Sequence, residues 1–138
     1  MDRENLLKLV PKHKFDLANA EELINIGYPE VEPVLPEIIE WVFDGNWPVA
    51  RCLQNFLEQL GKPAAPYLKR IFDGDYESAK HSILTGVVGH SKELALELRR
   101  ELVRMAHSPT LGEVHEQVNE EAQDILGRLN DVSDVDWK

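Results

Sequence analysis

Apolar residues recur at helical spacing along almost the whole chain, and this pattern leaves little room for any fold other than an all-helical one. One such stripe consists of Val49, Leu53, Phe56, Leu57 and Leu60. Prolines and glycines fall between the stripes, where helices begin and end, and no segment shows the period-two alternation of a strand. The sequence therefore predicts an all-α protein of about seven or eight helices.

Two segments of the chain match each other, and each contains a Phe-Asp-Gly turn. Residues 43–51 align with residues 72–80, and a Pro-x-x-Pro helix start precedes both. Each unit reads as a helix, a tight turn, an aromatic residue and a second helix. Because such a helix pair cannot bury its apolar face alone, it must stack on a neighbour. We therefore expect a short HEAT-like stack of antiparallel helix pairs.

The repeat also suggests how the chain is divided. We expect a single helical-repeat domain over residues 1–130, with repeat units at about 30–61 and 62–89, and an acidic tail over residues 131–138. Two capping boxes are predicted at helix starts, one from Asn19 with Glu22 and one from Thr110 with Glu113.

The distribution of charge bears on possible partners. The net charge is −10, and residues 17–50 carry seven acids but no lysine or arginine. Binding to nucleic acid is disfavoured because phosphate contacts require a basic face. No stretch approaches the roughly 20 apolar residues of a membrane span. An acidic surface could instead steer a basic protein partner, but solvated helix faces without a binding role are the more usual explanation of such a charge run.

No residue pattern marks a catalytic, cofactor or metal site. The five histidines form no His-x-x-x-His pair, and none has ligand spacing to the single cysteine. Cys52 lies among apolar neighbours and is predicted to be a structural thiol. Because a single cysteine cannot form an internal disulfide, a reducing cytoplasm is favoured. No catalytic residue, cofactor or metal ligand is therefore predicted.

Candidate binding residues come from the acidic stretch and from the polar loop before it. Trp41 is offset by one position from the neighbouring apolar stripe and lies beside acids. Partial exposure would make it a suitable anchor for a protein partner, while burial in the core is the alternative. The loop over residues 12–16 is either a contact site or a simple connector. The candidate protein-binding residues are Trp41, Glu37, Glu40, Asp44, Lys14 and Asp16.

Three sequence blocks resemble a known family. They are Asp-Gly-Asn-Trp-Pro-Val-Ala at 44–50, Leu-Val-Pro-Lys-x-Lys-x-Asp at 9–16 and Ser-Pro-Thr at 108–110. Together they resemble the bacterial domain-of-unknown-function family 5071 over nearly the whole chain. The resemblance implies a small helical-repeat protein with no established activity, and members of such families sometimes look like immunity proteins beside toxins. The chain departs from the family pattern at residues 77–81 and at His13.

Three functions remain open at this point. The first is a non-catalytic protein-interaction domain, such as an immunity protein or an adaptor that binds a basic protein. The second is an enzyme with a site assembled between helices, where Lys14, Asp16 and His90 could gather. The third is a self-associating structural protein.

Overall fold

The structure is a computed structural model that describes residues 2–130, so the predicted tail over 131–138 lies outside the described residues. Within residues 2–130 the chain forms ten α-helices, three short 3-10 helices and no strand. The all-α prediction is confirmed. The helices are α1 (Arg3–Leu7), α2 (Leu17–Ile26), α3 (Leu35–Glu40), α4 (Pro48–Leu60), α5 (Ala65–Phe72), α6 (Glu77–Gly86), α7 (Lys92–Glu97), α8 (Arg99–His107), α9 (Leu111–His115) and α10 (Val118–Leu129). The 3-10 helices are η1 (Glu32–Val34), η2 (Lys62–Ala64) and η3 (Val88–His90).

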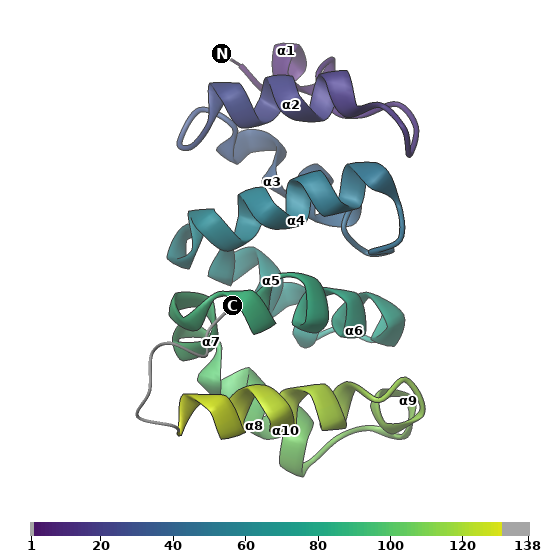
Figure 1. Cartoon of the computed structure of the whole chain (residues 1–138), viewed down its shortest axis with the longest axis vertical. Helices are drawn as coiled ribbons and strands as arrows, with labels where there is room; N and C mark the ends of the chain where they lie inside the picture. Colours follow the sequence, from purple (N-terminus) through teal and green to yellow (C-terminus); the bar gives the residue numbers. More distant parts are fainter. Residues whose placement is uncertain (1, 131–138) are drawn as a thin grey trace.

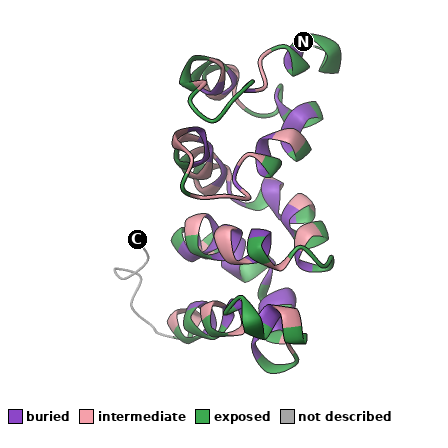
Figure 2. Ribbon diagram, turned by 90° about the vertical axis from the view of Figure 1, so that its right-hand side faces the viewer, coloured by how far each residue is buried: buried purple, intermediate pink, exposed green. Residues whose placement is uncertain are grey.

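The helices stack in two columns. Figure 1 shows α2, α4, α6 and α10 one above another, and Figure 2 shows the second column beside them, with the buried residues between the two. One apolar cluster runs through the described chain from Leu6 in α1 to Leu126 in α10. Each Phe-Asp-Gly turn joins two consecutive helices, α3 to α4 and α5 to α6. The two corners are thus equivalent, while the specific likeness to HEAT repeats stays a prediction.

The helix count exceeds the expected seven or eight because two expected helices are each divided in two. Residues 91–107 bend at Leu98, whose φ of −103° and ψ of 14° separate α7 from α8. Residues 110–129 break at Gln117, which takes a left-handed conformation with φ 61°. Periodicity does not report such breaks, because apolar residues continue in register on both sides of them.

One predicted capping box forms and the other does not. Thr110 and Glu113 exchange hydrogen bonds at the start of α9, as predicted. The prediction for Asn19 is wrong, because Asp16 occupies the N-cap of α2 and its carboxylate accepts hydrogen bonds from the Asn19 backbone N and side-chain Nδ2. Aspartate is as good an N-cap as asparagine, and α2 therefore begins earlier than expected.

Gly61 ends α4 in a backbone conformation that is almost exclusive to glycine, with φ 69° and ψ −131°. A Cβ there would also collide with the carboxylate of Glu93, which accepts a hydrogen bond from Lys62 N at 2.6 Å. We expect Gly61→Ala to lower the free energy of unfolding by about 1–3 kcal/mol in urea denaturation. The matched control is Gly127 in α10, where a Cβ meets nothing within 4 Å. Gly127→Ala should raise stability by about 0.5–1 kcal/mol, and equal effects at both sites would contradict this explanation.

Within residues 2–130, no helix has the combination of length and apolar character that crossing a bilayer requires.

Candidate functional site

Alternate connections between helices lie along one edge of the stack. In Figure 1 the α1–α2 loop, the α3–α4 corner, the α5–α6 corner and α9 all lie on the right-hand side. We call this side the corner edge. Backbone connections are where functional side chains are most often presented by a rigid scaffold, so this edge is the first place to look for a site.

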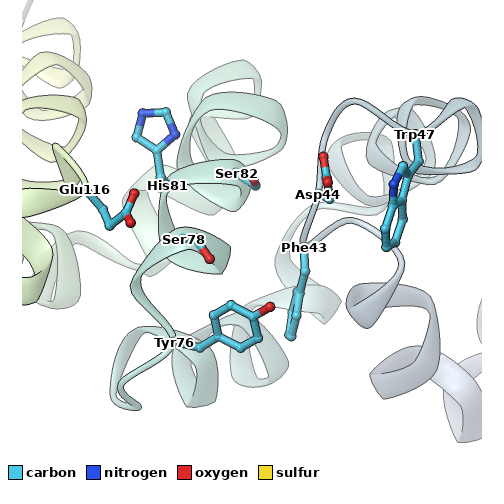
Figure 3. Close-up of a pocket in the computed structure, with 8 residues that line it drawn as sticks. All are labelled: Phe43, Asp44, Trp47, Tyr76, Ser78, His81, Ser82 and Glu116. Carbon is cyan, nitrogen blue, oxygen red and sulfur yellow. The ribbon is translucent and has the colours of Figure 1, made fainter.

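A hollow of about 350 Å³ lies at the corner edge, and we call it the corner groove. Figure 3 shows Glu116 at one end, Trp47 at the other, and side chains of α6 between them. The rings of Phe43 and Tyr76 meet edge to face, with centroids 5.3 Å apart. Tyr76 is 58% exposed and therefore presents much of its ring to an incoming molecule. The lining residues are Phe43, Asp44, Trp47, Tyr76, Ser78, His81, Ser82 and Glu116.

A second hollow of about 410 Å³ continues the corner groove toward α9 and shares three of its residues, Tyr76, Ser78 and Glu116. The additional lining residues are Asp75, Glu77, Gly112 and His115. The two hollows thus present four carboxylates, and no lysine or arginine of the described chain lines either of them. The lining itself therefore contains no lysine or arginine that would balance these carboxylates.

The carboxylate of Glu77 is unusual within this surface. Its Oε2 atom is buried and has no hydrogen-bond partner among the described residues. The side chain packs over Gly112, where a Cβ would collide with Oε1. An unsatisfied buried acceptor of this kind costs free energy.

A third hollow, of about 300 Å³, adjoins the corner groove at Trp47, and we call it the Trp recess. Trp41 and Trp47 form two of its walls, with ring centroids 5.4 Å apart and planes at 65°. The remaining lining residues are Val10, Glu37 and Glu40. No lysine or arginine of the described chain lines this hollow either.

Glu37 in the Trp recess forms an ion pair with the guanidinium group of Arg3. Arg3 Nη1 lies 3.0 Å from Glu37 Oε1, and Arg3 Nη2 lies 2.9 Å from Glu37 Oε2. Arg3 also donates to the Pro33 carbonyl at 2.6 Å. The hydrogen bonds from Arg3 lower the pKa of Glu37, against the opposing effect of burial. Glu40, by contrast, is exposed and has no ion-pair partner in the described part of the chain.

The structure brings together some of the residues named from sequence and separates others. Trp41, Glu37 and Glu40 share the Trp recess, while Asp44 lies in the neighbouring corner groove. Asp44 also accepts a hydrogen bond from Asn46 N at 3.0 Å, which shapes the corner.

Lys14 and Asp16 line none of these hollows. The Lys14 carbonyl accepts from Val49 N at 3.2 Å, so the loop is tied to the start of α4. Asp16 caps α2, and hydrogen bonds from Lys12 N and from Asn19 lower its pKa. The structure thus gives both residues a visible role within the fold.

The polar residues of the corner groove do not form a nucleophile–base pair. His81 lies on the same helix as Ser78 and Ser82, yet its Nε2 faces Glu121 Oε1 at 4.0 Å, and no hydrogen bond in residues 2–130 joins it to either serine. In this structure the His81 imidazole is therefore not positioned to activate either serine.

The other proposed catalytic and metal-binding groups are not assembled either. No hollow described here joins Lys14, Asp16 and His90. In the described chain, no three His, Cys, Asp or Glu side chains are grouped to hold a metal ion. Cys52 is half-buried, and burial together with the nearby Glu21 raises the pKa of its thiol, which keeps the less reactive protonated form.

Comparison with known proteins places this fold in a family. The sequence model of the family described as domain of unknown function (DUF5071) matches residues 9–126. The chain belongs to this family. The DUF5071 match begins at Leu9 in the α1–α2 connection and ends at Leu126 in α10, so it contains all of the corner groove. No curated protein gives a significant match to the chain.

The aromatic residues of the corner groove were missed by sequence reasoning, although a signal for them existed. Tyr76 aligns with Trp47 in the internal repeat, and Phe43 belongs to the first Phe-Asp-Gly turn. The repeat pattern places an aromatic residue just after each turn. Since the two turns lie at the same edge of the stack, their aromatic residues also converge on one surface. Glu116 and His81 carried no comparable signal.

Proposed function

We propose that the protein is a non-catalytic binding domain that recognises a basic segment of another protein through the corner groove and its continuation toward α9. The observation that carries the proposal is the composition of this lining, which combines four carboxylates, the exposed ring of Tyr76 and two half-buried aromatic rings with no lysine or arginine. Opposite charge in a partner increases the rate of encounter and selects against acidic competitors.

The aromatic rings supply what the carboxylates alone do not. Exposed ion pairs contribute little affinity in water, typically about 0–1 kcal/mol each. Tyrosine and tryptophan are enriched among the residues that dominate binding energy, because they bury large rings at a small entropic cost. Tyr76, Phe43 and Trp47 are therefore the proposed anchors, and Asp44 and Glu116 are proposed to orient the basic side chains of the partner between them.

Glu77 adds negative charge to this lining, although its Oε2 atom is buried and is not directly accessible to a partner. Such a surface would suit two classes of protein. One is an immunity protein that binds a basic toxin, and the other is a cytoplasmic adaptor.

A displayed library of random peptides tests this function without knowledge of the natural partner. We expect the selected peptides to be enriched in arginine and lysine. Their affinity should fall about tenfold or more, roughly 1.4 kcal/mol, in the double variant Asp44→Lys/Glu116→Lys, and also with rising salt. The control is Glu30→Lys/Glu120→Lys, which makes the same charge change at exposed positions outside the hollows. Peptides with no basic enrichment, or equal losses in both variants, would overturn the proposal.

A further inference from the structure

We infer that the Trp recess is a separate pocket for one cationic side chain, an arginine or a lysine of the partner. This inference rests on the proposed binding of a basic segment, because it names the side chain that such a segment would insert beside Trp47. It shares only Trp47 with the corner groove, so variants at Glu40 and Trp41 test it independently.

The first step of the argument is the arrangement of the two indole rings. The ring planes of Trp41 and Trp47 are inclined at 65° and their centroids are 5.4 Å apart, which is an edge-to-face contact and not a parallel stack. The two rings form adjoining walls of the hollow. Both are only half-buried. The face of an indole attracts a cation more strongly than any other aromatic side chain, and two such walls around one volume are the arrangement by which proteins bind ammonium and guanidinium groups.

The second step is the charge at the rim. Glu37 and Glu40 both line the Trp recess, but only the Glu37 carboxylate has an ion-pair partner among the described residues. Glu37 is held in a bidentate pair with Arg3. This pair shows that a carboxylate at the rim can bind a guanidinium group through two parallel hydrogen bonds. Glu40 is exposed and has no charged partner in residues 2–130, so it is the carboxylate proposed to bind a cation from outside.

The third step concerns the nearest basic side chain on the other side of Glu40. Glu40 also borders a hollow of about 240 Å³ that contains Arg70. The Arg70 guanidinium lies 5.3 Å from the centroid of Tyr67, and no ion pair in the described chain joins it to Glu40. Neither Arg3 on one side nor Arg70 on the other forms an ion pair with Glu40. The chain also shows, in Arg70 and Tyr67, the same kind of cation–ring contact that the Trp recess is proposed to make.

The test uses three small probes titrated into the full chain, namely the N-acetyl amides of arginine, lysine and citrulline. Citrulline has nearly the shape of arginine but carries no charge. Binding is followed by the indole N–H signals of Trp41 and Trp47 in ¹⁵N NMR, assigned with single Trp→Phe variants. We expect a saturable shift of both signals with the arginine probe, the lysine probe or both, and at least a fivefold weaker response to citrulline. Whether arginine or lysine binds more tightly identifies the preferred side chain.

Two variants locate the site. Glu40→Gln and Trp41→Leu should each weaken binding of the preferred probe about threefold to tenfold. Glu120→Gln, the same change on the exposed face of α10, should leave it unchanged. An equal response to citrulline, or loss of binding in Glu120→Gln but not in Glu40→Gln, would overturn the inference. Because Asp44 and Glu116 are intact in all these variants, peptide binding at the corner groove can persist when this test fails.

Discussion

Glu113→Gln is expected to lower the free energy of unfolding by about 3–5 kcal/mol, the largest effect of any single charge removal in this chain. Glu113 is completely buried in α9, and Lys80 of α6 is 1% exposed. The Glu113 carboxylate accepts hydrogen bonds from Lys80 Nζ at 2.8 Å and from Arg104 Nη1 of α8, also at 2.8 Å. It further accepts from Thr110 N at 2.9 Å, so one side chain connects three helices and caps one of them.

The expected loss comes from the charges that remain after the substitution. Glutamine keeps one acceptor for Thr110 N but brings an amide N–H₂ toward the buried Lys80 ammonium, which then has no counter-charge. Removing one partner from a buried ion pair is costly because the other stays desolvated. Lys80→Met should cost less, since Glu113 would still be paired with Arg104.

Chemical denaturation at pH 7, followed by circular dichroism, measures these differences. Glu120→Gln is the matched control, because Glu120 is exposed on α10 and the same change should shift stability by less than about 0.5 kcal/mol. A greater loss for Lys80→Met than for Glu113→Gln would show that this interpretation of the buried charges is wrong.

The stability of the protein is also expected to fall by about 3 kcal/mol on acidification through the protonation of Glu113 alone. Burial raises the pKa of Glu113, but hydrogen bonds from Arg104, Lys80 and Thr110 N outweigh it and lower the pKa to about 2. The unfolded chain therefore binds this proton at a higher pH than the folded protein does. The stabilisation is complete above about pH 5 and is lost as the pH falls toward 2.

Comparison of the wild type with Glu113→Gln isolates this contribution. The pKa values of Asp16 and Glu37 are lowered as well, so both proteins should lose stability in acid. Those losses cancel in the difference between the two proteins. We expect the gap in unfolding free energy to be widest at pH 7 and to narrow steadily below pH 5. A gap that stays constant down to pH 3 would contradict the lowered pKa.

Much of the fold could be predicted because its determinants are local. Gly27 and Gly61 end helices at positive φ, and Ser91 and Thr110 cap the helices that follow them, all at the predicted positions. The break at Gln117 could not be predicted, since nothing in a glutamine at that point signals a left-handed residue. Such a break depends on how α9 and α10 pack against the rest of the stack.

The candidate site was less accessible to prediction because it depends on contacts between distant residues. The acidic stretch drew attention to Glu37, Glu40 and Trp41, and the structure places all three around one hollow. Sequence alone could not show that Arg3 neutralises Glu37, 34 residues away. Glu113 is the clearest case, since its capping box was predicted from the spacing while its burial against Lys80 could not be. Periodicity places residues on helix faces but does not say which faces meet.

A reciprocal charge exchange tests most directly whether the corner groove recognises basic segments. Two peptides are compared by isothermal titration calorimetry: a selected peptide, and the same peptide with glutamate in place of its critical arginines. Each is titrated into the wild type and into the double variant Asp44→Arg/Glu116→Arg. We expect the unchanged peptide to lose about tenfold or more in affinity and the acidic peptide to recover most of that loss with the variant. Failure of the acidic peptide to bind the variant better than it binds the wild type would contradict electrostatic recognition at this surface.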